Sequence, residues 1–148
     1  MCGIFGYIGH QQALPILVEG LRRLEYRGYD STGVAVDDGE SIQTHKTVGK
    51  VADLKAILPS SVEGSLGIAH TRWATHGGVT QVNTHPHASV EGTVHLVHNG
   101  IIENFQQLRK GLATRGIECV SETDSEVLVH MIALELKNGS TPLKSVQN

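Results

Sequence analysis

Four segments of the chain carry apolar residues at helical spacing. In residues 12–28 the apolar positions recur every three or four residues, which places them on one face of a helix. Pro15 is compatible with the first turn of this helix, and Gly28 is typical of a helix end. The apolar residues on that face are Leu14, Leu17, Val18, Leu21 and Leu24. The pattern predicts further helices over residues 50–59, 104–116 and 123–139.

The helix predicted over residues 123–139 has the clearest signals at its two ends. Thr123 followed by Glu126 matches a capping box, in which each side chain accepts a hydrogen bond from the backbone of the other residue. Gly139 stands where the helix would end. We therefore predict that this helix begins at Thr123.

Runs of β-branched and apolar residues between turn residues predict the strands. Residues 3–9, "GIFGYIG", are predicted to form a buried strand interrupted by glycines. Residues 31–39 and 40–49 predict a hairpin that turns at "DDGE". Residues 65–77 begin as a strand and end in a polar loop. Residues 93–100, "TVHLVHNG", predict a strand whose final Asn-Gly is compatible with a hairpin turn.

The order of these elements indicates the fold class. Strands and helices are mixed without the regular alternation of a parallel sheet, so we expect an α+β fold. The 148 residues are about the length of one domain. A new element begins within the last residues, "STPLKSVQN", and we interpret the chain as incomplete at this end.

Composition and charge argue against several classes of protein. Hydrophobic residues make up 39% and charged residues 18%, as in soluble globular proteins. The net charge of −3 gives no indication of binding to nucleic acid. No apolar run approaches the roughly 18 residues of a membrane helix, and the N-terminus lacks the pattern of a signal peptide. The two cysteines, Cys2 and Cys119, form no disulfide framework, so we expect a cytoplasmic protein.

Cys2 directly follows the initiator methionine, and this position suggests a catalytic nucleophile. If Met1 is removed, Cys2 carries both a thiol and a free α-amino group. Since a free α-amine titrates at about 7.7–8.0, it can act as the base that activates the thiol at neutral pH. The alternative interpretation is that Cys2 is a small hydrophobic residue of the strand.

The polar stretch "HTRWATHG" offers groups for ligand binding. Arg72 presents parallel N–H donors that fit a carboxylate. Trp73, the one tryptophan, lies in the predicted loop, where it can cover a ligand. Thr75 and His76 add hydrogen-bonding groups, and Gly77 lets the loop bend. The alternative is a surface contact between Arg72 and Trp73 without any ligand.

Three further candidates each have a structural alternative. Asn99 and Gly100 in "HNG" can supply a side-chain amide and a backbone N–H to an oxyanion, or can simply form a turn. Asp124 in "ETDSE" can pair with the ammonium group of a substrate, or can complement the dipole of the helix that begins there. The local sequence does not decide between these interpretations.

The nine histidines raise the question of a metal site. His85 and His87 flank a proline in a loop, whereas His95 and His98 are three positions apart on a predicted strand and so face opposite sides. No second pair of cysteines and no His-Glu-x-x-His pattern completes a set of ligands. We therefore expect histidines that organise the structure, and neither a metal nor another cofactor.

Six stretches, spread along essentially the whole chain, resemble motifs of one family. They occur here in the same order as in that family. They are "MCGIFGYIG", "RLEYRGYDSTG", "GIAHTRWATHG", "THPH", "HNGIIEN" and "TDSEV". They are similar to the class II glutamine amidotransferase domains of glutamine–fructose-6-phosphate aminotransferases. The resemblance implies an N-terminal-nucleophile hydrolase fold, which is a four-layer α/β/β/α sandwich of two antiparallel sheets, here incomplete.

The resemblance also implies a role for each candidate residue. Cys2 would attack the side-chain carboxamide of L-glutamine with its own α-amine as base, and Asn99 and Gly100 would hold the oxyanion. Ammonia would leave, and water would hydrolyse the γ-glutamyl thioester to glutamate. Glu122 receives no role. The residues implied to bind glutamine or to support Cys2 are Arg72 at the α-carboxylate, Asp124 at the α-ammonium group, Trp73, Thr75, His76 and Gly77 around the pocket, and Arg27 beside the nucleophile.

In that family, two sugar-phosphate isomerase domains follow the glutaminase domain and use the ammonia to convert fructose 6-phosphate to glucosamine 6-phosphate. We expect residues 1–148 to be a partial glutaminase domain without these isomerase domains. Fructose 6-phosphate would then be a partner only of the longer enzyme, which we expect to be a homo-oligomer. Two alternatives stay open, namely another class II amidotransferase with a different acceptor, and an inactive fragment or regulatory module.

Overall fold

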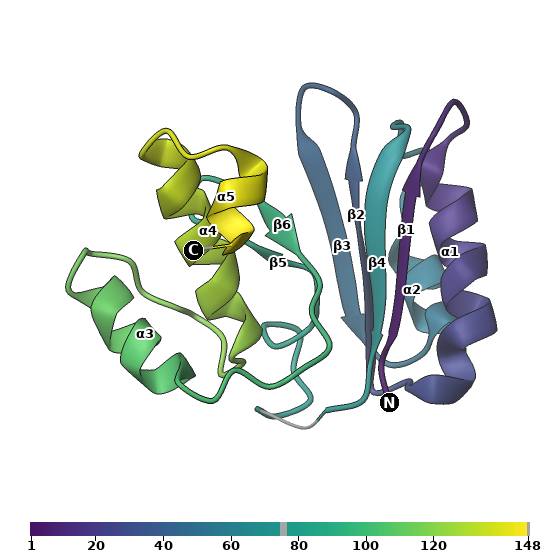
Figure 1. Ribbon diagram of the computed structural model, residues 1–148. Helices are drawn as coiled ribbons and strands as arrows, with labels where there is room; N and C mark the ends of the chain where they lie inside the picture. The colour runs from purple at the N-terminus through teal and green to yellow at the C-terminus, as the bar shows by residue number, and fades with distance from the viewer. Residues whose placement is uncertain (75–76, 148) are drawn as a thin grey trace.

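The computed structural model describes residues 1–74 and 77–147, and its largest element is a four-stranded antiparallel sheet (Figure 1). The strands lie in the order β1-β4-β2-β3, and each neighbouring pair is antiparallel. The bounds of the strands are β1 Gly3–Ile8, β2 Ser31–Asp37, β3 Ile42–Val48 and β4 Leu66–Arg72. The predicted hairpin of residues 31–49 is therefore confirmed as β2 and β3, and the strand that begins residues 65–77 is confirmed as β4.

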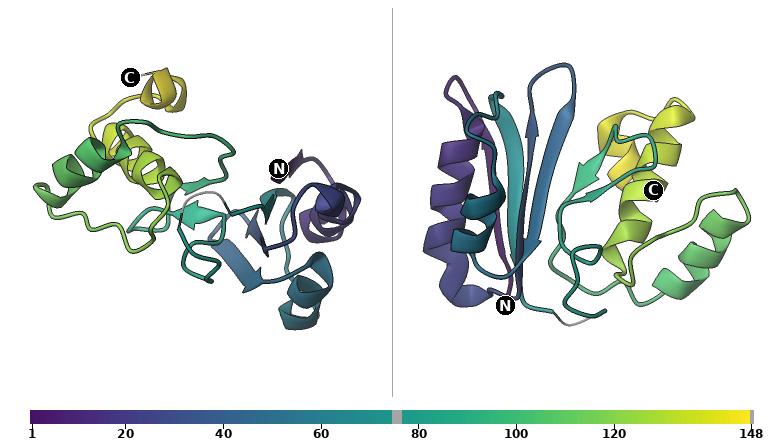
Figure 2. Two further views of the ribbon diagram at one scale, coloured as in Figure 1. Left: turned by 90° about the horizontal axis from the view of Figure 1, so that it is seen from below. Right: turned by 180° about the vertical axis from the view of Figure 1, so that it is seen from behind.

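Two helices cover one face of this sheet (Figures 1 and 2). They are α1 (Ala13–Leu24) and α2 (Val51–Ile57), and a 3-10 turn, η1 (Glu25–Arg27), follows α1. The predicted apolar face of α1 is buried against the sheet, except that Leu24 lies at its margin. The buried core between the helices and the sheet consists of Ala13, Leu14, Leu17, Val18, Leu21, Val34, Val36, Val51, Leu54, Val62 and Ala69.

The opposite face of the sheet looks toward a second layer of strands (Figure 1). Strands β5 (His87–Ala88) and β6 (His95–Leu96) form a small antiparallel sheet. Helix α4 (Ser125–Lys137) packs against both strands, and α3 (Phe105–Ala113) and α5 (Pro142–Gln147) pack against α4. The expected α/β/β/α layers are thus confirmed, with two strands in the second sheet of the described residues. None of the helices in these residues combines the length and the apolar character needed to cross a membrane.

The strand predicted over residues 3–9 is confirmed as β1, but the prediction that this strand is buried is wrong. β1 is an edge strand of the sheet, and its side chains alternate between the core and solvent. Phe5 and Tyr7 pack against the core, whereas Ile4 is 45% and Ile8 80% exposed. The apolar run looks like a buried strand because the face that points away from the core also carries apolar residues, the exposed isoleucines Ile4 and Ile8.

The strand predicted over residues 93–100 is also mostly wrong. Only His95–Leu96 pairs, and Asn99 and Gly100 do not turn a hairpin. The chain continues instead to Ile102, whose backbone N–H donates to Asp124 Oδ2 at 2.8 Å. This hydrogen bond ties the segment to a residue 22 positions away at the start of α4, and no local pattern signals it.

The predicted capping box of α4 does not form. The residue that precedes the helix is Asp124, and Glu126 turns back to accept hydrogen bonds from Ser121 N at 2.6 Å and Ser121 Oγ at 2.6 Å. Thr123 Oγ1 contacts His87 Nε2 at 2.9 Å. Both side chains of the expected box are therefore engaged by tertiary partners. The end of this helix is predicted well, since Gly139 follows it with a φ of 89°.

Gly33 shows how closely the segment before β5 lies on the sheet. A Cβ at Gly33 would overlap the carbonyl oxygen of His85 and approach Lys46 Cγ to 3.1 Å. We expect Gly33→Ala to lower the free energy of unfolding by about 1–3 kcal/mol or more, because neither backbone can yield. Urea unfolding measures this change.

Gly111→Ala is the matched control for Gly33→Ala. Gly111 lies in α3, and a Cβ there meets no atom within 4 Å. This substitution is expected to raise the free energy of unfolding by up to about 1 kcal/mol, because alanine favours the helix. Equal stability of Gly33→Ala and the unsubstituted protein would contradict the close contact with His85.

Candidate active site

Cys2 lies directly before β1 and beside the end of β4. The backbone N–H of Trp73 donates to Cys2 Sγ at 3.3 Å, and the thiol reaches the carbonyl oxygen of Trp73 at 3.6 Å. The next residue, Gly3, pairs with Thr71 of β4 and donates its N–H to Thr71 Oγ1 at 3.2 Å. The sheet therefore fixes the sulfur, and an N–H donor stands where negative charge on the sulfur would develop.

Arg27 supports Cys2 from the other side. Its Nε donates to the carbonyl oxygen of Cys2 at 3.3 Å, and its Nη2 lies 3.9 Å from Met1 Sδ. Met1 itself is 74% exposed and belongs to no strand. Cys2 is thus held by hydrogen bonds with Trp73 and Arg27.

Arg72 is the last residue of β4 and points to the face opposite the helices. Side chains of a strand alternate between the two faces, so His70 and Arg72 lie across the sheet from Ala69, which belongs to the core under α1. The guanidinium group donates to the carbonyl oxygens of Gly78 at 3.0 Å and Gly77 at 3.4 Å. These two bonds orient a cation whose residue is only 4% exposed.

Asp124 lies across from Arg72, at the start of α4. The residue is 4% exposed, and Oδ2 accepts the N–H of Ile102 at 2.8 Å while Oδ1 accepts Ser125 Oγ at 3.3 Å. Because Ile102 follows Asn99 and Gly100 by two or three residues, the bond to Asp124 also holds the "HNG" loop beside this carboxylate.

One cavity brings the predicted residues together from segments far apart in the sequence. The residues that line it are Cys2, His70, Arg72, Trp73, His85, His98, Asn99, Gly100, Thr123, Asp124 and Ser125. Gly77 contributes through its bond to Arg72, and Arg27 lies behind Cys2. The Trp73 ring is 47% exposed and stands edge-on to Tyr29, with 6.1 Å between the ring centroids. Thr75 and His76 lie outside the described residues.

The histidines were expected only to organise the structure, but His70, His85 and His98 line the cavity. The ring of His70 stacks on His85 with 4.4 Å between centroids, and His85 meets His87 edge-on at 4.5 Å. His98 donates its backbone N–H to His85 Nδ1 at 3.3 Å, and its own Nδ1 lies 3.1 Å from Ser125 Oγ. The alternation of β4 could have identified His70, because it stands two residues before Arg72 and so shares its face.

These buried histidines predict a specific loss of stability in acid. Burial, aided by the nearby charge of Arg72, lowers the pKa of His70 to about 3, and burial lowers the pKa of His87 to about 4, both from 6.5. The folded protein keeps both rings neutral below pH 6.5, whereas the unfolded chain protonates them. Each ring therefore lowers the free energy of unfolding by about 1.4 kcal/mol per pH unit as the pH falls from 6.5 toward the folded-state pKa.

Urea unfolding at several pH values between 6.5 and 4.5 measures this dependence. We expect His70→Gln to flatten the slope by about one proton, that is about 1.4 kcal/mol per pH unit. His10→Gln, at an exposed position, is the matched control and should leave the slope unchanged. A free energy of unfolding that stays constant from pH 6.5 to 4.5 would contradict the neutral histidines.

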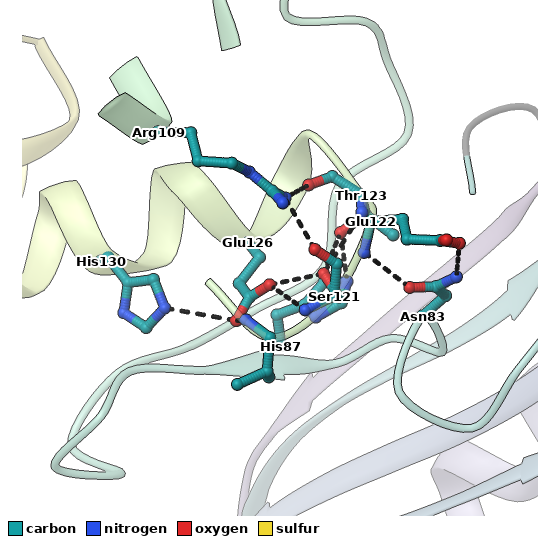
Figure 3. Close-up of polar contacts among 9 residues, drawn as sticks. Asn83, His87, Arg109, Ser121, Glu122, Thr123, Glu126 and His130 are labelled. Atoms are coloured by element: carbon teal, nitrogen blue, oxygen red, sulfur yellow. Dashed lines mark hydrogen bonds and ion pairs between the residues drawn. The ribbon is translucent and has the colours of Figure 1, made fainter. Parts of the chain in front are cut away.

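The segment between α3 and α4, which leads to Asp124, is anchored by two charged side chains (Figure 3). Arg109 Nη2 donates to the carbonyl oxygens of Ser121 at 2.7 Å and Thr123 at 3.0 Å. Glu126 accepts the N–H groups of Val120 at 2.8 Å and Ser121 at 2.6 Å. The backbone on which Asp124 depends is therefore fixed from both helices.

Cys119, Glu126 and His130 form a group of potential metal ligands whose donor atoms lie within 4.8 Å of one another. Burial raises the pKa of Glu126, but the hydrogen bonds from Ser121, Val120 and His130 outweigh it and lower the pKa below its ordinary value. His130 Nε2 lies 3.4 Å from Glu126 Oε1. Since both carboxylate oxygens of Glu126 already have partners, we interpret Glu126 as an anchor of the loop and not as a metal ligand.

Comparison with known proteins gives the family. The family model described as "Glutamine amidotransferase domain" matches residues 52–145, which is more than half of the chain. The chain belongs to the glutamine amidotransferase family. The family resemblance inferred from the six sequence stretches is therefore confirmed.

The curated relatives of this glutamine amidotransferase domain are much longer proteins. The glutamine–fructose-6-phosphate aminotransferase (isomerizing) of Clostridium tetani is 55% identical over 133 residues, which are 89% of this chain and 22% of the relative. The protein of the same name from Mycobacterium tuberculosis is 47% identical over 145 residues, which are 95% of this chain and 23% of the relative. The chain thus spans about a quarter or less of the length of these relatives.

Solved structures share the fold of this glutamine amidotransferase domain. The glutamine phosphoribosylpyrophosphate amidotransferase of B. subtilis, solved in complex with ADP and GMP, has a TM-score of 0.82 at 32% identity. A structure described as the allosteric regulatory enzyme of purine biosynthesis has a TM-score of 0.85 at 33% identity. Each match covers 99% of this chain and 32% of the other. These neighbours confirm the N-terminal-nucleophile fold.

Proposed function

We propose that this chain is the glutaminase domain of a glutamine–fructose-6-phosphate aminotransferase and that Cys2 is its nucleophile. The observation that carries the proposal is the shared cavity of Cys2, Arg72, Asn99, Gly100 and Asp124. A thiol, a cation, an anion and two oxyanion donors are the groups that hydrolysis of an amino-acid side-chain amide requires.

In the proposed complex, Arg72 and Asp124 bind the two charged groups on the α-carbon of glutamine. The guanidinium group of Arg72 pairs with the α-carboxylate, and the carboxylate of Asp124 pairs with the α-ammonium group. The side-chain carboxamide then extends toward Cys2, with Trp73 at the rim. Thr75, His76 and Gly77 complete the pocket in this proposal, and Arg27 holds the backbone of Cys2.

The first half of the proposed reaction forms a thioester. The α-amine of Cys2, free after removal of Met1, takes the proton of the thiol, and the sulfur forms a bond to the carboxamide carbon. The electron pair of the C=O bond moves to oxygen, where Asn99 Nδ2 and the N–H of Gly100 stabilise the charge. When the C=O bond reforms, the C–N bond breaks and the leaving nitrogen takes the proton from the α-ammonium group of Cys2, so ammonia departs.

The second half releases glutamate. The α-amine of Cys2 takes a proton from water as the water oxygen bonds to the thioester carbon. The C–S bond then breaks, and the sulfur recovers the proton. This cycle needs no cofactor, and it needs a reduced thiol. Since Cys2 and Cys119 are both free, we place the enzyme in the reducing cytoplasm.

The choice of acceptor rests on the relatives. The chain is 55% identical to the glutamine–fructose-6-phosphate aminotransferase of C. tetani and 47% identical to that of M. tuberculosis, but 32% identical to the phosphoribosylpyrophosphate amidotransferase of B. subtilis. We therefore propose fructose 6-phosphate as the acceptor of the ammonia, bound outside residues 1–148. A phosphoribosylpyrophosphate acceptor is the second candidate, which the similarity of fold favours.

To test this, the full-length protein is incubated with L-glutamine and with either fructose 6-phosphate or phosphoribosylpyrophosphate. Formation of glucosamine 6-phosphate and glutamate in equal amounts is the expected result with fructose 6-phosphate. Transfer of nitrogen to phosphoribosylpyrophosphate would instead support the second candidate. Failure to release glutamate with either acceptor would contradict the glutaminase function itself.

A further inference from the structure

Asn83 and Glu122 are joined by two reciprocal hydrogen bonds (Figure 3). Asn83 Nδ2 donates to Glu122 Oε2 at 2.8 Å, and the backbone N–H of Glu122 donates to Asn83 Oδ1 at 2.8 Å. The two residues are 39 positions apart, and Asn83 is only 2% exposed. The contact therefore ties two distant segments together at one fixed point.

The same two side chains hold the backbone of Gly78. Glu122 Oε2 accepts the N–H of Gly78 at 2.9 Å, and Asn83 Nδ2 donates to the carbonyl oxygen of Gly78 at 3.0 Å. That carbonyl oxygen also accepts Arg72 Nη1 at 3.0 Å. We call the hydrogen bonds that join Asn83, Glu122 and Gly78 the Asn83–Glu122 brace. Through Gly78, the brace reaches the guanidinium group of Arg72.

At its other end the brace reaches Asp124. Glu122 stands two residues before Asp124, in the segment that Arg109 and Glu126 also anchor. Arg72 comes from the end of β4 and Asp124 from the start of α4, so the two belong to different layers of the fold. The brace is a direct connection between these layers at the cavity.

The corner at Gly77 fits the brace closely. Gly77 has a φ of 76°, which residues with a side chain rarely adopt. A Cβ there would lie 2.9 Å from Asn83 Nδ2 and 2.9 Å from Glu122 Cβ. The absence of a side chain at Gly77 thus lets the loop and the brace touch.

We infer that Asn83 and Glu122 are positioning residues, which set the separation of Arg72 and Asp124 for one α-amino acid. This inference rests on the proposed function. The α-carboxylate and the α-ammonium group of glutamine are attached to one carbon, so their separation is nearly constant. Two binding groups from different layers recognise both charges at once only if the protein holds them at a matching distance.

Charge supports the same connection. The pKa of Glu122 is lowered by the hydrogen bond from Gly78, by the bond from Asn83 and by the nearby Arg72. Glu122 is therefore an anion that faces the cation it helps to orient. Its own side chain is exposed outside these contacts, so it adds no packing to the core.

The test measures glutamine hydrolysis by the full-length protein with Asn83→Ala, Glu122→Ala and both substitutions together. We expect each single substitution to raise the KM for glutamine about tenfold or more and to change kcat much less, because binding geometry is lost while Cys2 keeps its own contacts. The KM of the double variant should not exceed the higher KM of the two single variants, since both substitutions remove the same connection. Gln81→Ala, an exposed neighbour of Asn83, is the matched control.

Glutamine α-methyl ester is a second probe, because it lacks the charge that Arg72 binds. Loss of the brace should lower kcat/KM for glutamine much more than for the ester. A brace that only supported the fold would instead lower kcat/KM for both substrates equally. The ratio of kcat/KM for glutamine to kcat/KM for the ester therefore separates a positioning role from a general effect on stability.

Two conservative variants keep the test decisive if the alanine variants fail to fold. Glu122→Gln keeps an oxygen with two lone pairs for Gly78 and Asn83, and its KM should stay within about threefold of the unsubstituted value. Asn83→Asp has the same size but turns a carboxylate toward Glu122, and its KM should rise as in Asn83→Ala.

An unchanged KM in Asn83→Asp and Glu122→Ala would overturn the inference, as would equal losses for glutamine and its ester. If the unsubstituted protein does not hydrolyse glutamine, the proposed function fails instead.

Discussion

Replacing Cys2 by alanine is expected to lower glutamine hydrolysis by at least about 10⁴-fold, because the sulfur forms the covalent bond in the proposed reaction. The binding groups Arg72 and Asp124 remain in this variant, so the protein should still bind glutamine. Ammonia release measures the loss, and equilibrium binding of labelled glutamine measures what is kept. The fold should be unaffected, since Cys2 lies before β1 and pairs with no strand.

Cys119→Ala is the matched control for Cys2→Ala. Cys119 is the other free cysteine and lies outside the cavity. Its substitution should leave the rate of ammonia release within about twofold, as expected for a residue away from the reacting atoms. A Cys2→Ala protein that releases ammonia at a rate near that of the unsubstituted protein would exclude the nucleophile proposed here.

Replacing Arg72 by alanine is expected to have the second largest effect. Removing one partner of a buried, hydrogen-bonded charge pair weakens binding by about 2–5 kcal/mol, so kcat/KM for glutamine should fall by about 30- to 5,000-fold. Arg72→Lys should recover only part of this loss, because an ammonium group cannot bond both carboxylate oxygens and the carbonyl oxygens of Gly77 and Gly78 together.

Steady-state kinetics with glutamine and with its α-methyl ester check the prediction for Arg72. In Arg72→Ala, kcat/KM should fall much less for the ester than for glutamine. Arg23→Ala removes an exposed arginine that pairs only with Glu19 among the ion pairs of the described residues, and it serves as the control. If Arg72→Ala leaves kcat/KM unchanged, the carboxylate is bound elsewhere.

Local patterns predicted an element correctly where all side chains on one of its faces enter the same core. The spacing from Leu14 to Leu21 predicts α1 because all of these side chains enter the same core. The alternation along β4 determines that Arg72 shares the face of His70. The family resemblance added the N-terminal-nucleophile fold and a role for each candidate residue, and the cavity brings six of these residues together. Their roles stay predictions until substitution tests them.

Local patterns did not predict the structure correctly where a residue is hydrogen-bonded to a partner outside its own segment. Glu126 matches a capping box but accepts a hydrogen bond from Ser121 instead. Asn99 and Gly100 match a hairpin turn, but the chain continues past them to Ile102, whose N–H donates to Asp124. Glu122 received no role, because its partner Asn83 is 39 positions away. Such contacts depend on how the two layers pack, and no single segment encodes them.

In the proposed reaction Cys2, with Met1 removed, carries the glutamyl group. Mass spectrometry of the full-length protein, quenched in acid during turnover of L-glutamine, detects this thioester. We expect an N-terminal peptide that begins at Cys2 and, in part of the molecules, carries the added mass of one γ-glutamyl group, which hydroxylamine removes. An N-terminal peptide that keeps Met1 in the active enzyme, or a glutamyl group on another residue, would contradict it.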